Sequence, residues 1–392
     1  MTFTLYGATW CHDCKQLKTY LGGHKIDYKY VDIDQDTNSQ SMIKELSGGQ
    51  TLIPTLVFDD GTVLVEPSEQ DLASKLGLED GNKTHFTDLI IVGAGPSGLA
   101  AAIYTTREGI ETEILEKKAV GGQAAITDRI ENYPGFPDGI SGMKLSEDMA
   151  KQAEEFGTKM KLGIEVNSIE DKGKYKVVKT SEGDLNAESV ILAVGTDYKR
   201  LNVPGETENI GRGVHFCATC DGPFFKNKEI IVVGGGNSAM QEGLFLTKFA
   251  AKITFIAWDS KLTGSDFLIQ KSLKEPKFSI NYMLQTTKIE KVGTKIKLYA
   301  TDRTTNEEKT FEADGIFVFI GLKPNTEFLK GGVVELDERG FIKTDKTLQT
   351  NVKGIFAAGD CRSGSTLQIA SAVGEGAVAA LMVREYLKGL EN

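Results

Sequence analysis

The segment DLIIVGAGPSGLAAAIYTTREGIETEILEK, residues 88–117, constrains the fold of this 392-residue chain more than any other stretch. An apolar run leads into three closely spaced glycines, a helical pattern follows, and an acidic residue ends the next apolar run. This order predicts a βαβ unit in which a dinucleotide pyrophosphate meets the helix N-terminus and the acid accepts a hydrogen bond from a ribose hydroxyl. The expected binding residues are Gly93, Gly95, Pro96, Ser97, Gly98 and Glu116.

A second strand–glycine–helix segment, EIIVVGGGNSAMQEGLFLTKFAAKITFIAWD, occupies residues 229–259. Two such units in one chain indicate two dinucleotides, or one dinucleotide and a degenerate site. We expect this second loop to bind through Gly234, Gly236, Asn237 and Ser238. A chain of this length is also expected to form two or three domains.

Composition and charge exclude several classes of protein. The formal net charge of −10 argues against nucleic acid or an anionic membrane as the main partner. No apolar run approaches the roughly 20 residues that span a bilayer. The first residues, MTFTLYGATW, have neither the basic start nor the apolar core of a signal peptide. We therefore expect a cytoplasmic protein that binds neither nucleic acid nor membrane.

Four of the five cysteines form two C-x-x-C pairs, Cys11/Cys14 and Cys217/Cys220. In a reducing compartment this spacing indicates metal or redox chemistry rather than structural disulfides. A four-cysteine zinc site would require the pairs to converge across about 200 residues, and the four histidines include no i, i+4 pair. We therefore expect redox chemistry and no metal.

Residues 1–80 read as a small α/β domain. The strand FTLYGA runs into the first cysteine pair, and the helix CKQLKTYLGGH follows it. Next come a strand in DYKYVDID, a helix in NSQSMIKELSG and a hairpin in TLVFDDGTVLVEP. Cys11 therefore stands at a helix N-terminus, where the helix dipole stabilises a thiolate and lowers the pKa of the thiol.

With TWCHDC and TLIPT, this region resembles the glutaredoxin family, and its mycoredoxin-type members in particular. The resemblance implies a thioredoxin fold in which Pro54 is cis and faces the cysteines. It also implies a substrate-binding surface at Trp10, Ile53 and Pro54. The Gly-Gly turn with which the family binds a small thiol is replaced here by VEPSEQD.

Linked motifs follow one another in residues 87–392: the first glycine loop, GGQ (121–123), IENYPG (130–135), CATCDG (217–222), GLKPNTEFL (321–329) and AAGD (357–360). Together they resemble the low-molecular-weight thioredoxin reductases and the flavoprotein of the alkyl hydroperoxide reductase system. The resemblance implies a homodimer and an FAD domain in two pieces, 87–201 and 325–392. The polar, non-periodic stretch before this domain predicts a linker at 81–86. A nicotinamide-type domain, 202–324, carries the second cysteine pair. The predicted class is α/β: an N-terminal thioredoxin-fold (glutaredoxin-like) domain plus two Rossmann-like three-layer dinucleotide-binding domains.

The resemblance also implies roles for single residues. Asp360 would hold the flavin ribitol, and the flavin would be lined by Gly122, Gln123, Asn132, Gly359, Gln368 and Ile369. Cys217 and Cys220 beside a flavin would alternate between disulfide and dithiol, with either cysteine as the attacking one. Asp221 would give or take the proton of the departing thiolate. Cys361 stands alone and is expected to be a packing residue.

The site of the electron donor departs from the thioredoxin reductases, where a His-Arg-Arg cluster grips the 2′-phosphate of NADPH. Ala257, Trp258 and Asp259 stand at those positions. No arginine occurs between Arg212 and Arg303. The alternatives are NADH bound through Asp259, NADPH bound weakly through Lys261, a protein donor such as ferredoxin, and a vestigial site.

These interpretations combine into a relay. Electrons enter FAD, reduce Cys217/Cys220, pass to Cys11/Cys14 by thiol–disulfide exchange, and leave to an external disulfide. Cys11, as the exposed cysteine at the helix start, is the expected attacking thiol, and Cys14 resolves the mixed disulfide. The first hypothesis for the substrate is a small-thiol disulfide such as oxidised glutathione. The alternatives are a protein disulfide, in thioredoxin or a peroxiredoxin, and a redox sensor that does not turn over.

Overall fold

The computed structural model describes residues 2–78, 84–127, 130 and 132–391, and the chain divides into two compact units. Unit 1 comprises Met1–Ala124, Leu145–Gly195 and Pro324–Asn392. Unit 2 comprises Ala125–Lys144 and Thr196–Lys323.

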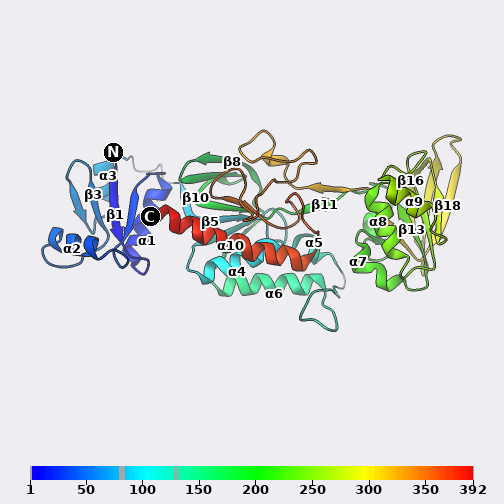
Figure 1. The fold of residues 1–392 in the computed structure, drawn as a ribbon, viewed down its shortest axis with the longest axis horizontal. Helices are drawn as coiled ribbons and strands as arrows, with labels where there is room; N and C mark the ends of the chain where they lie inside the picture. Colours follow the sequence, from blue (N-terminus) through cyan, green and yellow to red (C-terminus); the bar gives the residue numbers. More distant parts are fainter. Residues whose placement is uncertain (1, 79–83, 128–129, 131, 392) are drawn as a thin grey trace. The chain divides into compact units, whose positions relative to one another are not determined.

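The N-terminal domain of unit 1 is a four-stranded sheet in the order β2-β1-β3-β4 (Figure 1). β1 pairs in parallel with β2, whereas β3 runs antiparallel to both β1 and β4. The strands are β1 (Phe3–Gly7), β2 (Lys29–Asp32), β3 (Thr55–Phe58) and β4 (Val63–Val65). The helices are α1 (His12–Gly23), α2 (Thr37–Leu46) and α3 (Glu69–Leu76).

This order confirms the thioredoxin-type fold, because α1 connects two parallel neighbours and a hairpin closes the other side of the sheet. Leu17 and Leu21 of α1, four residues apart and hence on one helix face, are buried with Leu5 and Leu56 of the sheet. α3 was not predicted. Its capping box, in which Ser68 and Asp71 bond each other's backbone N–H, is formed by the last four residues of VEPSEQD.

The larger domain of unit 1 is built on a seven-stranded sheet in the order β7-β6-β5-β10-β9-β8, with β21 pairing in parallel beside β10. β7, β6, β5 and β10 are parallel, and the hairpins of β8, β9 and β10 are antiparallel. The strands are β5 (His85–Val92), β6 (Thr112–Glu116), β7 (Lys159–Leu162), β8 (Val166–Lys172), β9 (Tyr175–Thr180), β10 (Gly183–Leu192) and β21 (Ile355–Ala357).

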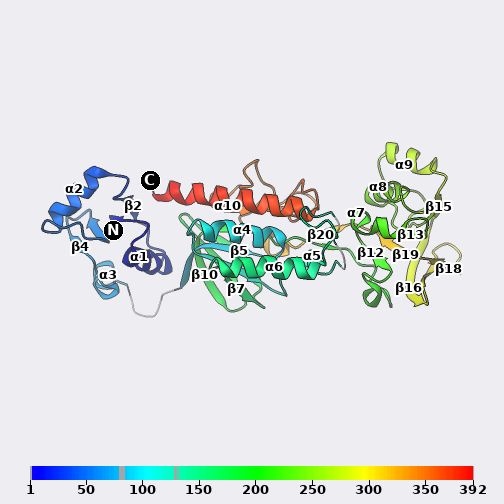
Figure 2. The same ribbon diagram turned by 90° about the horizontal axis from the view of Figure 1, so that it is seen from below.

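Two helices from opposite ends of this domain's sequence, α4 (Pro96–Arg107) and α10 (Ile369–Glu391), lie side by side (Figures 1 and 2). The two helices approach so closely that a Cβ on Gly376 would collide with the backbone oxygen of Ser97. Glycine at position 376 therefore permits this packing. This packing returns the C-terminal segment to the first glycine loop. The other helices are α5 (Gly122–Ala125), α6 (Gly142–Glu155) and a 3₁₀ turn at Glu327–Leu329.

Unit 2 contains a parallel sheet in the order β12-β19-β13-β14-β15 and an antiparallel sheet in the order β16-β17-β18. The strands are β12 (Val214–His215), β13 (Glu229–Val233), β14 (Lys252–Ile256), β15 (Phe278–Asn281), β16 (Leu284–Val292), β17 (Lys295–Asp302), β18 (Glu308–Ala313) and β19 (Gly315–Val318). The helices are α7 (Ala218–Asp221), α8 (Asn237–Leu246) and α9 (Asp266–Leu273). Short elements are β11 (Thr196–Tyr198), β20 (Leu322–Pro324) and 3₁₀ turns at Thr207–Asn209 and Gly222–Phe225.

Within unit 1, the C-terminal end of α1 contacts the sheet of the larger domain. Asn186 of β10 donates from Nδ2 to the carbonyl oxygens of Gly22 and Gly23, at 3.2 and 3.3 Å. The hydroxyl of Tyr175 donates to the carbonyl oxygen of Ile26 at 2.7 Å. A Cβ on Gly22 would overlap the ring of Phe86, so only glycine fits there without a shift. The N-terminal domain is therefore held by its own surface as well as by the chain.

The predicted domain boundaries stay predictions, with one correction at the linker. β5 begins at His85, so His85 and Phe86 belong to a strand rather than to the predicted linker 81–86. The rest of that linker falls largely outside the described residues. Among the helices of the described residues, none combines the length and the apolar character needed to cross a membrane.

Candidate functional site

The first cysteine pair lies where the sequence predicts it, at the start of α1. Cys11 is the N-cap, with extended backbone, and its Sγ accepts a hydrogen bond from the backbone N–H of Cys14 at 3.1 Å. The two cysteines form a disulfide with their Cα atoms 5.3 Å apart. Cys11 is 6% exposed and Cys14 1%, so Cys11 is the more accessible of the two. The expectation that Cys11 is an exposed cysteine is wrong, because its side chain is buried.

The residues expected to bind substrate surround Cys11. The Ile53–Pro54 peptide bond is cis, as the resemblance implies, and the carbonyl oxygen of Ile53 lies 3.8 Å from Cys11 Sγ. Trp10 is 70% exposed and donates from Nε1 to Asp34 at 2.7 Å. A disulfide approaching Cys11 would thus meet the backbone carbonyl of Ile53, with the exposed indole of Trp10 next to Cys11 in the sequence.

The second pair repeats this arrangement in unit 2. Cys217 is the N-cap of α7, and its Sγ accepts from the backbone N–H of Cys220 at 3.1 Å. The two residues form a disulfide with their Cα atoms 5.3 Å apart. In each pair the N-terminal sulfur is therefore the one that a backbone N–H would stabilise as a thiolate.

Asp221, expected to handle a proton, has a partner that sequence reasoning missed. Nδ1 of His215 lies 3.0 Å from its Oδ2, and both side chains are largely buried. The imidazole stacks on Phe317 and meets Phe225 edge-on. Asp221 does not cap the following 3₁₀ turn with its side chain. In the sequence, the one feature that points to this pairing is that His215 lies two residues before Cys217.

The first glycine loop has the geometry that its spacing predicts. Gly93 has φ +107°, and a Cβ there would collide with the carbonyl oxygen of Ala193. Gly98 packs against the backbone of Gly93 equally closely. At Gly95, the N-cap of α4, no side chain caps the helix, and a Cβ would meet nothing within 4 Å. Pro96 then begins α4.

Three other segments of unit 1 converge on this loop. Glu116, at the end of β6, accepts from the backbone N–H of Ala94 at 2.9 Å. The backbone N–H of Gly121 donates to Ala94 at 2.7 Å, which brings Gly122 and Gln123 of α5 alongside. A Cβ on Gly359 would lie 3.0 Å from that of Ser97.

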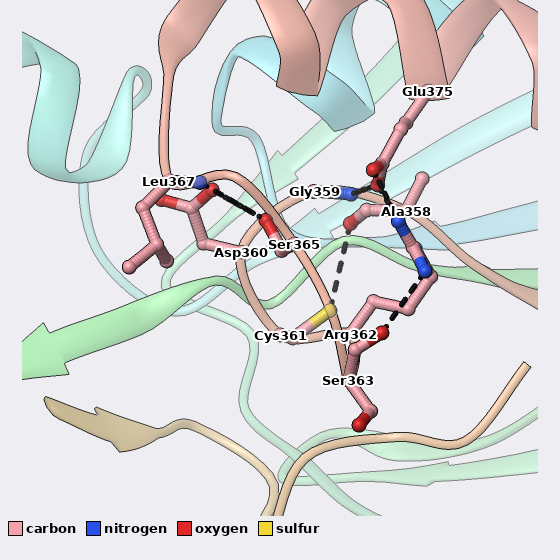
Figure 3. Close-up of polar contacts among 9 residues, drawn as sticks. All are labelled: Ala358, Gly359, Asp360, Cys361, Arg362, Ser363, Ser365, Leu367 and Glu375. Atoms are coloured by element: carbon pink, nitrogen blue, oxygen red, sulfur yellow. Dashed lines mark hydrogen bonds and ion pairs between the residues drawn. The ribbon is translucent and has the colours of Figure 1, made fainter. Parts of the chain in front are cut away.

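Asp360 lies in the third of these segments, just after β21 (Figure 3). The hydroxyl of Ser365 donates to its Oδ1 at 3.3 Å and accepts from the backbone N–H of Leu367 at the same distance. Burial raises the pKa of Asp360 to about 6, against the hydrogen bond from Ser365, and the nearby Glu375 adds to the rise. Glu375 itself accepts from the backbone N–H of Gly359 at 2.8 Å and pairs with Arg362.

These residues fit a dinucleotide flavin cofactor. The helix N-terminus at Gly95 is uncapped and open, which suits a pyrophosphate. Within the described residues, the buried hydroxyl of Ser97 has no hydrogen-bond partner. Gln368 precedes Ile369, the first residue of α10, whose N-terminus thus lies close along the chain to Asp360. Asn132 belongs to unit 2, and its role at the flavin stays a prediction.

The second glycine loop also keeps its geometry. Gly234 has φ +138°, and Gly236 is an N-cap of α8 with no side-chain hydrogen bond and open space at its Cβ position. Asn237 Oδ1 accepts from the backbone N–H of Ser265 at 2.7 Å, which leaves that side chain engaged within the protein. Ser238 lies in the first turn of α8. Asp259 follows β14, and its carbonyl oxygen accepts from the backbone of Met283 at 3.2 Å.

Comparison with known proteins agrees with this geometry. Residues 87–376 match the family model described as pyridine nucleotide-disulphide oxidoreductase, and residues 3–63 match the glutaredoxin model. Thioredoxin reductase of Bacillus subtilis (strain 168) is 41% identical over 307 residues, which are 78% of this chain and 96% of that protein. Thioredoxin reductase of Treponema pallidum (strain Nichols) is 40% identical over 308 residues, which are 78% of this chain and 98% of that protein.

The solved structures give the same result. Thioredoxin reductase from Streptococcus pyogenes MGAS5005 is similar with a TM-score of 0.74 and 36% identity, over 78% of this chain and 99% of that one. Thioredoxin reductase from Giardia duodenalis has a TM-score of 0.73 and 31% identity, over 77% of this chain and 99% of that one. Such relatives imply FAD and a pyridine nucleotide as cofactors. The chain belongs to the pyridine nucleotide-disulphide oxidoreductase family, as a thioredoxin reductase-like flavin disulfide oxidoreductase with an N-terminal glutaredoxin domain.

Proposed function

We propose that this enzyme passes electrons from Cys217/Cys220 to Cys11/Cys14 and on to a small-thiol disulfide such as oxidised glutathione. The observation that carries the proposal is the matched geometry of the two pairs. Each N-terminal sulfur accepts a hydrogen bond from a backbone N–H three residues on, at 3.1 Å. A pair built in this way can be both the acceptor and the donor of thiol–disulfide exchange.

The residues that would hold FAD are those of the first glycine loop together with Glu116, Gln123 and Asp360. When bound, FAD supplies two electrons to a nearby disulfide. The protein itself stabilises the negative charge of the cysteine thiolate and moves the proton of the departing sulfur. The backbone N–H of Cys220 stabilises a Cys217 thiolate, and Asp221 with His215 exchanges a proton with the departing sulfur.

Thiol–disulfide exchange between the two cysteine pairs needs no further oxidant or reductant. A thiolate of the Cys217/Cys220 dithiol attacks the Cys11–Cys14 disulfide, and its neighbour then resolves the mixed disulfide. The first pair ends as a dithiol and the second as a disulfide, so two electrons and two protons have moved. Cys11 repeats the attack on the external disulfide, because its Sγ is the more accessible sulfur and receives the Cys14 N–H.

A protein disulfide is the second candidate substrate. Trp10 supports it, because an exposed indole beside a reactive sulfur suits contact with a partner surface. The curated relatives are thioredoxin reductases, which by name act on a protein of the thioredoxin fold. A thioredoxin-fold protein or a peroxiredoxin would be such a partner.

The test measures disulfide turnover by the full chain with NADH, NADPH or reduced ferredoxin as donor. Oxidised glutathione should be consumed, and Cys11→Ser should reduce the rate by about 100-fold or more. Cys361→Ala is the matched control, since this buried cysteine belongs to neither pair. Undiminished turnover by Cys11→Ser would contradict the relay.

The same assay separates the alternatives. Turnover only with thioredoxin or a peroxiredoxin would favour the protein substrate, and Cys14→Ser should then trap that protein on Cys11. Absence of turnover with every donor and substrate would favour a redox sensor. The choice of donor, a homodimeric state and a cytoplasmic location are predictions that rest on the sequence.

A further inference from the structure

An arginine lies over the indole that replaces the first arginine of the usual NADPH clamp. The guanidinium carbon of Arg303 is 3.9 Å from the ring centroid of Trp258, and Nη1 donates to the Trp258 carbonyl oxygen at 2.9 Å. Arg303 comes from the turn after β17, some 45 residues farther along the chain. The arginine that the sequence around Trp258 lacks is thus supplied by another hairpin of unit 2, in addition to the nearby Lys261.

Backbone hydrogen bonds fix this arrangement. The N–H of Arg303 donates to the carbonyl oxygen of Met283 at 2.7 Å, and the N–H of Met283 donates to that of Asp259 at 3.2 Å. The N–H of Leu284 donates to Ala257 at 3.0 Å. Three loops are therefore tied together at the end of β14, and Arg303 cannot leave the strand end without breaking these bonds.

The strand end adjoins the second glycine loop. The N–H of Gly234 donates to Ile256, the last residue of β14, at 3.0 Å. A Cβ on Gly235 would lie 3.3 Å from that of Ala257. In βαβ dinucleotide sites the adenosine ribose is recognised by residues at the end of this second strand. Arg303 and Trp258 hence stand at the adenosine end of the site.

The charge of Arg303 is not neutralised by a neighbouring acid. Within the part of the chain that the structure describes, no carboxylate pairs with it. The adjacent Asp302 is engaged elsewhere: Lys309 lies 2.8 Å from its Oδ2, and the backbone of Thr304 donates to Oδ1. These contacts lower the pKa of Asp302 to about 2. Arg303 keeps Nε and Nη2 for a ligand.

We propose that Arg303, stacked on Trp258, forms a binding subsite for the 2′-phosphate of an adenine dinucleotide, so that the donor is NADPH rather than NADH. The inference deepens the proposed function, since it identifies the electron donor of the same enzyme. Arginine binds phosphate with paired, charge-assisted hydrogen bonds, and the indole limits its rotation. Asp259 lies in the same loop and opposes the phosphate, so the subsite is cationic through Arg303 and not through β14.

The test is a binding titration that requires no turnover. The chain has two tryptophans, so a Trp10→Phe background leaves Trp258 as the only fluorescent indole. Its emission is followed while adenosine 2′,5′-bisphosphate or adenosine 5′-diphosphate is added to the FAD-loaded protein. The bisphosphate should bind more tightly by about 10- to 100-fold, as expected for a charge-assisted phosphate contact.

Variants of Arg303 separate charge from packing. Arg303→Gln should reduce affinity for the bisphosphate by about 10- to 100-fold and affinity for the diphosphate by less than about threefold. Arg303→Lys should fall between, because it keeps the charge without the planar fork. Asp259→Asn should increase bisphosphate affinity. Arg339→Gln, which removes an arginine stacked on Phe341 at 4.8 Å in unit 1, is the matched control and should change neither affinity.

Three results would overturn the subsite: equal affinity for the two nucleotides, an equal loss of both in Arg303→Gln, or no binding of either. None of these depends on disulfide turnover. Reduction of oxidised glutathione after photoreduction of the flavin tests the proposed function separately. If that reaction fails while the bisphosphate still binds, oxidised glutathione is not the substrate. The assignment of Arg303 to the 2′-phosphate is unaffected by that result.

Discussion

Nδ1 of His215 and Oδ2 of Asp221 lie 3.0 Å apart. Asp221 directly follows Cys220 in the sequence, and His215 lies two residues before Cys217. The imidazole stacks on Phe317 and meets Phe225 edge-on, with ring centroids 5.3 and 5.1 Å away. At this distance the imidazole and the carboxylate can form a hydrogen bond. We therefore propose that His215 and Asp221 act together on the proton at Cys217/Cys220, where the sequence suggests the aspartate alone.

Replacing His215 should slow the chemistry without unfolding unit 2. His215→Phe keeps an aromatic ring against Phe317 but removes Nδ1, so we expect the dithiol–disulfide step to slow by about 10-fold or more. Rapid-mixing kinetics of the pre-reduced protein with a disulfide, from about pH 6 to 9, measure this step and its pH dependence. A purely structural role would lower the melting temperature and leave the pH profile unchanged. Phe225→Leu, which disturbs the same ring without touching a proton, is the control.

Gly22 should be intolerant of any side chain. An added methyl group would overlap the Phe86 ring, so Gly22→Ala should lower the free energy of unfolding by about 1–3 kcal/mol. Gly389→Ala is the matched control, because Gly389 is an exposed helical glycine with open space around it. That change should stabilise by up to about 1 kcal/mol. Denaturant unfolding measures both, and equal effects would contradict the tight contact between α1 and β5.

Asp88 should make stability depend on pH. Burial, and then the charge of Glu188, raise its pKa to about 7, although Lys18 and a hydrogen bond from the Glu111 backbone act against this. Because the folded chain then holds a proton that the unfolded chain has lost, this contribution falls as pH rises from about 4 to about 7.

Asp88→Asn keeps an acceptor for the Glu111 N–H and removes the charge. Relative to the unaltered chain it should be more stable by about 1–3 kcal/mol near pH 8 and nearly neutral near pH 4. Asp302→Asn is a control of opposite sign, because the pKa of Asp302 is lowered. Unfolding curves at both pH values decide the matter, and a pH-independent difference would count against the raised pKa.

Cys361 should resist alkylation. It is fully buried, it lies near the carbonyl oxygens of Leu192 and Ala358, and burial raises the pKa of its thiol to about 12. Iodoacetamide applied to the reduced native protein at about pH 8 should label Cys11, Cys217 and Cys220 and spare this one. Peptide mass spectrometry gives the labelling, and fast modification of Cys361 would refute its role in packing.

Local patterns were enough for the parts of the molecule that chain geometry alone determines. The two glycine loops and the helix start at Cys11 follow from short segments whose physical demands are strict, whereas the cis Pro54 is what the glutaredoxin resemblance implies. Gly93, for example, needs a positive φ and no Cβ, and both demands are visible in its spacing. α3 lies in VEPSEQD, which the glutaredoxin resemblance presents as a replaced turn, and its eight residues are too short for a clear helical periodicity.

Pairings between distant segments could not be predicted in this way. His215 meets Asp221 only because α7 turns the chain back toward β12. Arg303 reaches Trp258 only because the hairpin of β17 and β18 packs beside the end of β14. Asn186 meets Gly22 across 164 residues. Each of these contacts depends on tertiary packing and leaves no periodic signal along the chain.

The docking of α1 through its far end has a consequence for encounter rates. Twelve residues at 1.5 Å each place Cys11 about 18 Å from the anchored end of the helix. A domain held in this way samples few orientations, so less rotational freedom is lost when its sulfur meets a reaction partner. The anchored domain presents Cys11 as a preorganised target rather than as the tip of a flexible tether, and its effective concentration depends on the folded surface more than on the length of the connecting chain.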